Sequence, residues 1–451
     1  MTKKIVIIGS GPTGLGAAYR LKDLGHENVT ILERNNYVGG LSASFKRDSG
    51  YTVDIGGHVL FSHYEYFDKA VAKALANDYL EHVREAWIWI QEKFVPYPFQ
   101  NNIKYLPKEM IWECLQGLMK IHGDSARTQN FEDWVMAIFG EGIAKHFMNP
   151  YNFKVWAHPL KMMSKDWIAE RVSVINFEKV LQNVILNKDD AGWGPNNIFK
   201  FPLRGGTGAI FEGIADEVRD KIQFNKTVVR VDSASKKLTL ESGETITYDV
   251  LINTSPLDKF IGISDLSAPY SELTKLLLHS SGYSIGVGFN RALDTNLRTK
   301  CWNYFPEANV PFYRVTYLSN YSPNMVPDIN NHFLLMCETS YSDYKKHSRD
   351  TIVDETIKGL LDSKFITPQD QALINFTDII EMDYSYPIPS LERDKALSEI
   401  IPALDSKDLY SRGRFGLWRY ETGNMDHSFM QGVEVVDKII SGKEEVTRYK
   451  N

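Results

Sequence analysis

The chain has 451 residues, of which 43% are hydrophobic and 24% charged, values typical of a globular protein. The 51 lysines and arginines against 57 aspartates and glutamates give a net charge of −6, which argues against a nucleic-acid partner. Three cysteines (Cys114, Cys301 and Cys337) exclude a disulfide framework and have no metal-ligand spacing. No apolar run approaches the ~18 residues of a membrane span, so we expect no membrane partner and a cytoplasmic location.

The first 34 residues predict a strand, a glycine turn, a helix and a second strand. The run KIVIIG (4–9) is continuously apolar, as in a parallel strand buried on both faces. A helix is predicted from about Pro12 to Leu24, with Gly25 as its C-terminal cap. NVTILER (28–34) is the next predicted strand.

Later segments alternate between helical and strand-like patterns. Residues 103–195 carry apolar side chains at helical spacing, including NFEDWVMAIFGEGIAKHFM (130–148), and predict a helical subdomain. Residues 204–218 predict a glycine turn and a helix, and 227–255 predict short strands followed by a buried strand. From 283 to about 385, alternating strands predict an antiparallel sheet, and a final helix is expected to stop at Gly442.

A glycine motif in the first turn predicts a dinucleotide site. Gly9, Gly11 and Gly14 form G-x-G-x-x-G between the predicted strand and helix, and Glu33 ends the next strand. The glycines allow the backbone to approach a pyrophosphate at the helix N-terminus, and Glu33 can accept hydrogen bonds from a ribose. The alternative is a glycine turn without a ligand, but strand, helix and acid together favour the dinucleotide site.

A second glycine pair favours FAD over NAD. ERNNYVGGLSASF (33–45) places this pair directly after the acidic residue, a pattern that resembles FAD-binding proteins of the amine-oxidase and glutathione-reductase type. In such proteins a C-terminal segment returns to cover the flavin at a helix N-terminus. GRFGLWRYETGNMDHS (413–428), before the last predicted helix, has the form expected for that role.

One arginine lies in an aromatic strand. FYRVTY (312–317) is rich in aromatic and β-branched residues, and strand alternation predicts Arg314 on the face of Phe312, opposite Tyr313. Arginine is rarely buried without a partner. We therefore expect either an anionic ligand or a buried carboxylate beside Arg314.

Rare strings spread over most of the chain resemble one family. They are DIGGHVLFSHYEYFD (54–68), VPYPFQNNI (95–103), PYNFKVWA (150–157), CWNYFPEANVPFYR (301–314), YPIPSLER (386–393) and GRFGLWRYETGN (413–424). They are similar to the UDP-galactopyranose mutases of the eukaryotic type. This resemblance implies an α/β fold with an FAD-binding Rossmann-like domain, a helical substrate domain and an antiparallel β-sheet domain.

The resemblance also implies the division of the chain. The FAD-binding domain would comprise 1–82, 202–258 and 408–451, and the helical substrate-binding domain 103–201. The antiparallel sheet domain would comprise 83–102 and 259–407.

The reaction implied by the resemblance is the redox-neutral interconversion of UDP-galactopyranose and UDP-galactofuranose. The implied nucleophile is N5 of reduced FAD, which attacks the anomeric carbon and displaces UDP. NADPH is the implied reductant, taken up in the substrate cleft. The family contains monomers, dimers and tetramers, so oligomeric state stays open.

The resemblance assigns roles to three residues near the chemistry. Arg171 and Arg314 would grip the diphosphate, and His58 would lie against the flavin in a mobile glycine-flanked loop. From the sequence alone, Arg171 in IAERV is better explained as a surface helix residue. His58 and His63 have no carboxylate companion in the sequence, so no metal is expected.

Substrate contacts implied by the resemblance are mostly aromatic. The uridine end would be held by Phe99, Gln100, Phe147, Tyr151, Asn152 and Trp156, the sugar by Asn196 and Trp302, and the diphosphate by Tyr304, Tyr321, Tyr386 and Tyr420, with Asn424 near the flavin. Core packing is the competing interpretation for Phe147 and Trp156.

Cofactor contacts implied by the resemblance lie in both glycine turns and in the C-terminal segment. They are Gly9, Gly11, Pro12, Thr13, Gly14, Glu33, Gly40, Leu41, Ser42, Gly57, His58, Val228, Arg414, Gly423, Asn424, Met425 and Ser428. Met425 departs from the glutamine usual in the eukaryotic branch, although the bacterial branch has methionine there.

Three alternatives stay open at this point. An FAD-dependent amine oxidase or desaturase shares the fingerprint but needs no diphosphate arginines. A binding module like the Rab GDP-dissociation inhibitors shares the fold without using FAD, and the intact glycines argue against it. A mutase for another nucleotide sugar differs only in hydroxyl contacts.

Overall fold

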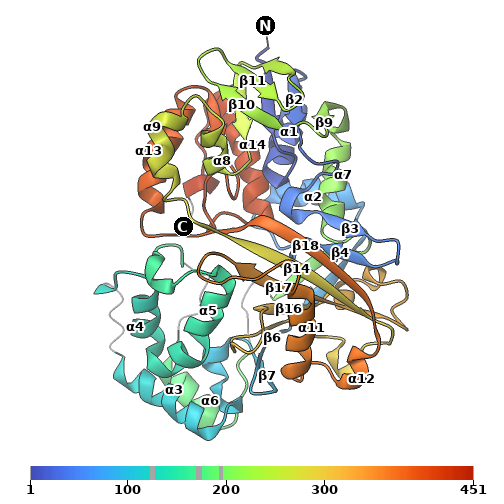
Figure 1. Ribbon diagram of the computed structural model, residues 1–451, viewed down its shortest axis with the longest axis vertical. Coiled ribbons are helices and arrows are strands. Elements are labelled where there is room, and N and C mark those ends of the chain that lie inside the picture. Colours follow the sequence, from blue (N-terminus) through green and yellow to red (C-terminus); the bar gives the residue numbers. More distant parts are fainter. Residues whose placement is uncertain (1, 122–126, 169–174, 192–196, 450–451) are drawn as a thin grey trace.

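A computed structural model describes residues 2–121, 127–168, 175–191 and 197–449. The upper part of the molecule in Figure 1 contains a five-stranded parallel sheet. In spatial order the strands are β19 (Leu409–Ser411), β13 (Val250–Asn253), β1 (Ile5–Ile8), β2 (Val29–Leu32) and β9 (Ile222–Gln223). The continuous apolar run at residues 5–8 therefore forms the central strand, as a strand buried on both faces must.

Alternate residues of β1 serve two separate cores. Ile5 and Ile7 pack with helices α1 (Pro12–Asp23), α2 (Glu65–Leu75), α7 (Gly208–Asp216) and α14 (Met425–Ser441). Val6 points the other way, into a core shared with α8 (Leu257–Gly262) and α13 (Arg393–Asp405). The result is a sheet covered by helices on both faces, the arrangement expected when side chains alternate along a buried strand.

A second sheet of seven strands crosses the middle of the molecule (Figure 1). The order is β18 (Ile374–Pro387), β14 (His279–Phe289), β17 (Phe333–Tyr341), β16 (Arg314–Tyr317), β15 (Trp302–Tyr304), β6 (Ala86–Ile90) and β7 (Lys93–Pro96). All pairs are antiparallel except β15 with β6, which is parallel. One face packs on α11 (Ile352–Asp362).

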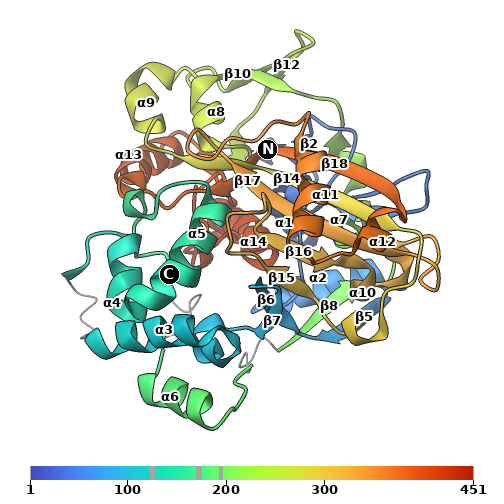
Figure 2. The same cartoon turned by 60° about the horizontal axis from the view of Figure 1, so that its bottom comes forward.

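The helical part lies beside this sheet (Figure 2). It contains α3 (Lys108–Lys120), α4 (Phe131–Ile143), α5 (Asn149–Trp156) and α6 (Phe177–Ile185). Within the predicted helical subdomain, the segment 130–148 has non-helical backbone at Gly140, where φ is +71°, and continues as a π helix at Ala144–Met148. The break brings α4 against α3, where a Cβ at Gly142 would lie 2.3 Å from the Glu113 carbonyl oxygen.

Shorter elements complete the described chain. They are β3 (Ser44–Lys46), β4 (Thr52–Asp54), β5 (Tyr79–Val83), β8 (Ile198–Pro202), β10 (Val228–Asp232), β11 (Lys237–Leu240), β12 (Thr245–Thr247), α9 (Ser267–Thr274), α10 (Leu318–Tyr321) and α12 (Pro368–Gln371). The predicted N-terminal elements, the strands within 227–255 and the final helix ending before Gly442 are confirmed.

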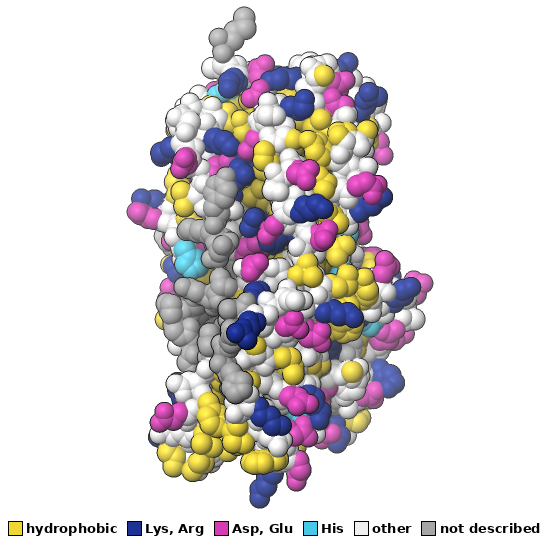
Figure 3. Space-filling view, turned by 90° about the vertical axis from the view of Figure 1, so that its left-hand side faces the viewer, with side chains coloured by type: hydrophobic (Ala, Val, Ile, Leu, Met, Phe, Trp, Pro, Cys, Tyr) yellow, Lys and Arg dark blue, Asp and Glu magenta, His cyan; other side chains and the backbone are white. Residues whose placement is uncertain are grey.

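The predicted fold class is confirmed by these sheets and helices. The division into three domains stays a prediction. Across the described ranges, no helix combines the length and the apolar composition that a membrane crossing requires. Figure 3 shows positive and negative side chains mixed over one face, with hydrophobic atoms gathered at its lower end.

Candidate active site

The glycine turn between β1 and α1 leaves a helix N-terminus open. Gly9 has φ of +97°, and a Cβ at Gly14 would lie only 2.0 Å from the Gly9 carbonyl oxygen. Helix α1 starts at Pro12 with Gly11 as its N-cap and has no side-chain cap. Its first N–H groups therefore lack a side-chain acceptor and are suited to an anion.

Glu33 lies directly beside this turn and is 5% exposed. Its Oε2 accepts hydrogen bonds from the Ser10 N–H and hydroxyl, both at 2.8 Å. Its Oε1 accepts from the Asn35 backbone N–H at 2.8 Å and the side-chain amide at 2.9 Å. These four hydrogen bonds use the acceptor sites of the carboxylate, so a ribose hydroxyl that binds Glu33 would replace a side-chain donor of Ser10 or Asn35.

The second glycine pair lies against the first turn. Gly39 N–H donates to the Ser10 carbonyl at 2.9 Å, and a Cβ at Gly40 would lie 3.3 Å from the Gly11 Cα. Both glycines have positive φ, +92° and +52°. Close approach of two backbones leaves room for an extended dinucleotide along the loops.

Helix α14 supplies a second open N-terminus. It begins after Asn424, whose side chain makes no cap, and Ser428 N–H bonds the Asn424 carbonyl at 2.8 Å. The helix packs directly on α1, because a Cβ at Gly432 would lie 2.0 Å from the Thr13 carbonyl oxygen. The C-terminal segment thus returns to the glycine turns, as the sequence predicts.

Arg314 has a buried carboxylate as its partner. Arg314 on β16 and Glu338 on β17 are directly opposite in register. The Arg314 Nη2 donates to Glu338 Oε1 at 2.7 Å, its Nε donates to Glu338 Oε2, and Nη2 also reaches the Gly57 carbonyl at 3.2 Å. Burial disfavours both charges, yet the pairing outweighs it and lowers the pKa of Glu338.

Sequence reasoning anticipated a carboxylate but could not name Glu338, because strand register is absent from the sequence. The expected alternation of 312–317 was also wrong at its start. Phe312 packs in the same hydrophobic core as Val315, on the side away from Arg314. Tyr313 lies on the side of Arg314, where its hydroxyl donates to Glu338 at 3.2 Å. The reason is that β16 begins only at Arg314, so the two preceding residues do not follow strand alternation.

His58 lies in the loop that contacts this ion pair. A Cβ at Gly57 would be 2.9 Å from both Arg314 Nη2 and Glu338 Oε2, so the loop backbone lies against the pair. The His58 Nδ1 is buried with no hydrogen-bond partner among the described residues. Burial is the main cause that lowers the pKa of His58 to about 4. The charges of Arg414 and Arg314 act in the same direction, and the charge of Glu338 opposes the shift. The imidazole is neutral at pH 7.

One aromatic cluster joins the helical part to the C-terminal segment. The Trp156 ring centroid lies 4.8 Å from that of Tyr420 and 5.6 Å from that of Tyr386. The Tyr386 and Tyr313 hydroxyls are 3.2 Å apart. The Arg414 guanidinium lies 5.1 Å from the Tyr386 ring and 5.4 Å from the Tyr420 ring. Predicted substrate residues therefore meet the predicted flavin residue Arg414.

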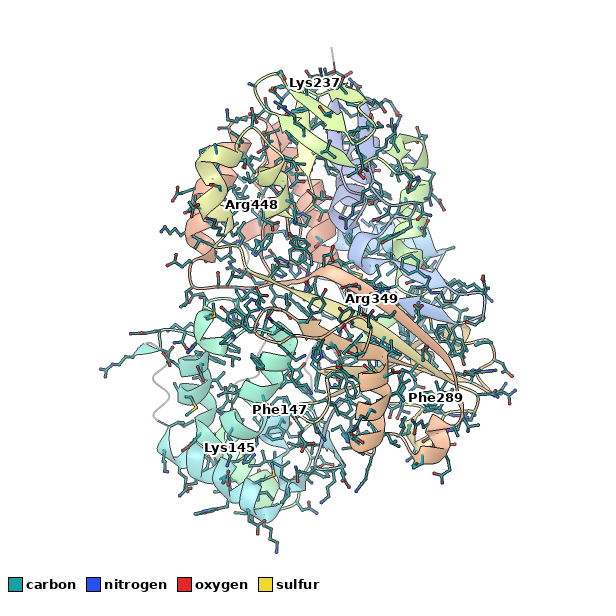
Figure 4. All side chains as sticks on the ribbon, in the orientation of Figure 1. Lys145, Phe147, Lys237, Phe289, Arg349 and Arg448 are labelled. Atoms are coloured by element: carbon teal, nitrogen blue, oxygen red, sulfur yellow. The ribbon has the colours of Figure 1, made fainter. Side chains whose placement is uncertain are left out.

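A second aromatic cluster extends toward β15. Phe147 (labelled in Figure 4) stacks on Phe99 at 4.6 Å and on Tyr151 at 5.1 Å. Tyr151 contacts Tyr304 at 5.1 Å, and Tyr304 contacts Trp302 at 6.4 Å. Both faces of Phe147 are thus covered by rings, so a ligand role for Phe147 stays a prediction.

Two buried indole N–H groups in this region have no partner among the described residues. The indole N–H groups of Trp156 and Trp302 are buried with no acceptor among the described residues. Such groups are rare in folded proteins unless a ligand or water completes them. The Asn152 amide donates to the Met148 carbonyl at 2.7 Å, and Gln100 is buried. Tyr321 is buried against Phe201, 5.1 Å away.

The roles of the predicted site residues stay predictions, and two of these residues cannot be placed. Arg171 and Asn196 lie outside the described residues. Val228 lies on β10, and Met425 opens α14 with 9% exposure. His63 does have a carboxylate companion, contrary to expectation, since its Nδ1 lies 3.2 Å from Asp426 Oδ2. With His427 these groups place ligand atoms within 4.8 Å of one another, and the contacts of both histidines with Asp426 account for that proximity.

Comparisons with known proteins identify the family and the fold. The family model described as flavin containing amine oxidoreductase matches residues 12–356. A crystal structure of reduced UDP-galactopyranose mutase is 43% identical, with a TM-score of 0.95, covering 100% of this chain and 96% of that one. A putative protoporphyrinogen oxidase from Exiguobacterium sp. 255-15 is 16% identical with a TM-score of 0.71, covering 98% and 100%, and shows the fold alone.

A curated 4,4'-diapophytoene desaturase from Staphylococcus aureus (strain COL) is 42% identical over 80 residues, a match that spans 18% of this chain and 15% of the desaturase. The fold and the glycine-lined site define a flavoprotein of the amine oxidoreductase type. Because this chain is 43% identical to a UDP-galactopyranose mutase over its whole length, it belongs to the UDP-galactopyranose mutase family.

The residues present fit FAD. Two uncapped helix N-termini, a buried carboxylate beside the first turn and the close glycine backbones match the needs of an extended dinucleotide. FAD is the cofactor of this chain. His58 and Arg414, both predicted flavin contacts, lie near each other, and the charge of Arg414 is one of those that lower the pKa of His58.

Proposed function

We propose that the chain is an isomerase that interconverts UDP-galactopyranose and UDP-galactofuranose without net oxidation. The observation that carries this proposal is the agreement with a UDP-galactopyranose mutase over the whole chain, at 43% identity and a TM-score of 0.95. The Arg314 site and the aromatic clusters beside the FAD loops support it, because the substrate combines a diphosphate with a uracil ring.

Arg314 is proposed to bind the diphosphate while Glu338 orients it. Three of the five N–H donors of Arg314 are directed at Glu338 and Gly57. The Nη1 group retains two donors, which have no acceptor among the described residues and are available to phosphate oxygens. Arg171 is the proposed second cation, and the tyrosine hydroxyls add neutral donors.

When bound and reduced, FAD supplies an electron-rich N5 that serves as nucleophile toward the anomeric carbon. The protein residues bind and orient the substrate and shield it from water. Arg314 stabilises the negative charge that develops on the departing UDP. Neutral His58 sits against the Arg314–Glu338 pair without adding charge, and the aromatic clusters exclude water from the sugar.

NADPH is the proposed reductant. The sequence has one G-x-G-x-x-G in the required context, and FAD accounts for it. NADPH also carries a diphosphate, so it is proposed to enter the same cleft as the substrate and to reduce the flavin once rather than at each turnover.

The decisive experiment incubates the purified protein with UDP-galactofuranose and dithionite and separates the nucleotide sugars by chromatography. We expect UDP-galactopyranose to form only with reduced flavin, with many turnovers per hydride when NADPH replaces dithionite under anaerobic conditions. Equal turnover by the oxidised protein, or one hydride consumed per product, would overturn the proposal. Peroxide release with amines would favour an amine oxidase.

The diphosphate role has its own test. Replacing Arg314→Ala removes a charged hydrogen-bonding group, worth about 1.5–3 kcal/mol, so kcat/KM should fall at least ~10-fold. The same reasoning applies to Arg171→Ala. Flavin content should stay constant, and UDP affinity unchanged in both variants would refute the assignment.

A further inference from the structure

Two of the rare sequence strings meet in a buried ion pair. YPIPSLER (386–393) ends at Arg393, the first residue of α13, and GRFGLWRYETGN (413–424) contains Glu421. The Arg393 Nη1 donates to Glu421 Oε2 at 2.9 Å, and its Nη2 donates to Glu421 Oε1 at 2.7 Å. Both side chains are 3% exposed. The contact is bidentate, a geometry that adds directional specificity to the attraction between the charges.

Stability alone does not explain a buried ion pair. Burial disfavours the charge of Arg393, but the charge of Glu421 outweighs burial, and the pKa of Arg393 is raised. Taking two charges out of water costs free energy that their attraction largely offsets without a large surplus, so apolar side chains of similar volume often stabilise a fold as well. An ion pair adds one fixed geometry, because two N–H groups must meet two oxygens. The pair should therefore matter for the backbone that it holds.

The backbone held by Glu421 presents the neighbouring residue, Tyr420. Residues 412–424 form neither helix nor strand, so side-chain contacts must fix this segment. The turn after Tyr420 is tight, because Gly423 N–H donates to the Tyr420 carbonyl at 3.1 Å and a Cβ at Gly423 would lie 3.0 Å from the Arg419 carbonyl oxygen. A shift of the Glu421 backbone would therefore move the Tyr420 ring with it.

The Tyr420 ring lies between two other elements of the candidate active site. Its centroid is 4.8 Å from that of Trp156 on α5 and 5.9 Å from that of Tyr386 on β18. Tyr386 belongs to the same string as Arg393, so the ion pair joins the two segments that carry the predicted diphosphate tyrosines. The separation of the two tyrosine rings thus depends in part on a contact outside the aromatic cluster.

We propose that Arg393 and Glu421 are a positioning pair, whose bidentate contact places the Tyr420 hydroxyl for a hydrogen bond to the diphosphate of the substrate. This inference rests on the proposed function, in which Tyr420 is a diphosphate donor. Arg393 and Glu421 do not touch the substrate and act through Tyr420. A hydrogen bond needs a narrow range of distance and angle, so a small displacement of the ring is enough to weaken it.

The test is a double-mutant cycle on UDP affinity, measured by calorimetric titration of UDP into the holoprotein. Tyr420→Phe removes one hydrogen bond and should weaken UDP binding about 3- to 10-fold. Glu421→Gln breaks the bidentate contact and should weaken UDP binding by a similar factor at unchanged flavin content. Because both changes remove the same hydrogen bond, Tyr420→Phe should weaken UDP binding less than about 2-fold in the Glu421→Gln background.

Two control variants separate positioning from a general loss of stability. Glu445→Gln breaks another buried pair, since the side chains of Glu445 and Arg412 are 3% and 0% exposed. It should lower the unfolding temperature but leave UDP affinity unchanged. Tyr304→Phe removes a hydroxyl on β15, so its effect on UDP affinity should be the same with and without Glu421→Gln.

A second variant keeps the inference testable if Glu421→Gln does not fold. Arg393→Lys retains the charge but replaces the planar fork by a single ammonium group, so it should also weaken UDP binding. Wild-type affinity in Glu421→Gln and Arg393→Lys, or an undiminished effect of Tyr420→Phe beside Glu421→Gln, would overturn the positioning role and leave the proposed function standing.

The remaining outcomes are equally distinct. Loss of flavin in parallel with UDP affinity would overturn the positioning role, because the pair would then hold the cofactor site. Absence of UDP binding by the wild-type holoprotein would overturn the proposed function and, with it, this inference.

Discussion

At the scale of single residues, the Arg314–Glu338 pair decides what the site can do. The pair is buried on the carboxylate side, where Glu338 is 4% exposed, while the Arg314 side chain is one-fifth exposed. Glu338 and Gly57 hold the Nε and Nη2 groups of the guanidinium, and among the described residues none accepts a hydrogen bond from Nη1. A preorganised donor of this kind loses little entropy when it binds a phosphate.

The energetic role of this pair can be measured by a double-mutant cycle. Arg314→Ala or Glu338→Gln alone should lower the free energy of unfolding by about 1–3 kcal/mol, because each leaves a buried polar group unpaired. The double variant should lose less unfolding free energy than the two single variants lose in sum. The control variant is Arg349→Ala. Arg349 (labelled in Figure 4) is exposed and forms an ion pair with Glu381 at 2.9 Å, so removing it should lower the free energy of unfolding by less than about 1 kcal/mol. Strictly additive losses in urea denaturation would contradict the coupling.

His58 makes a prediction about pH. Its folded-state pKa, about 4, lies below the ordinary value of 6.5, so as pH falls the unfolded chain takes up the proton first. The stability that His58 contributes is therefore present above pH 6.5 and lost as pH falls toward 4. Ring-proton NMR of the oxidised holoprotein should show no His58 titration between pH 5.5 and 8. A midpoint near 6.5 would show that the imidazole is not buried as described.

At the scale of elements, the two helices α1 and α14, whose N-termini have no side-chain cap, pack directly against each other. Gly16 and Gly432 allow α1 and α14 to touch through their backbones, since a Cβ at Gly16 would lie 2.2 Å from the Phe429 carbonyl oxygen. Side chains at these positions would separate the helices. The crossing thus explains how residues 400 positions apart contribute to one cofactor site.

Gly14→Ala tests the turn at the start of α1. The added Cβ would lie 2.0 Å from the Gly9 carbonyl oxygen, so the turn must move. We expect loss of most bound flavin, read as the ratio of flavin to protein absorbance. Gly262→Ala is the control, because nothing lies within 4 Å of its Cβ. Equal flavin content in the two variants would show that the turn does not position the cofactor.

At the scale of the whole molecule, the predicted FAD contacts join segments from residue 9 to residue 428. A ligand that binds only the folded state stabilises it by mass action. Removing FAD should therefore lower the unfolding temperature by several degrees, and Glu33→Ala should lower flavin occupancy and unfolding temperature together. Excess FAD should restore part of both in the variant. Full flavin occupancy in Glu33→Ala would mean that Glu33 only accepts hydrogen bonds from Ser10 and Asn35 and does not bind the cofactor.

Local sequence determined the parts of this protein whose physics is local. The apolar run at 5–8, the glycines of the first turn, Glu33 at the end of β2 and the stop of α14 before Gly442 all follow from periodicity and backbone preference. The rare strings were enough to indicate the family, which the comparison over the whole chain confirmed.

Only the tertiary structure decided which residues meet across strands and helices. Glu338 became the partner of Arg314 because β16 and β17 pair in one register, and a shift of one residue would have turned it to the other face. The same holds for the contact between the Trp156 and Tyr420 rings. Contacts between distant segments depend on packing and register, which neither composition nor spacing along the chain encodes.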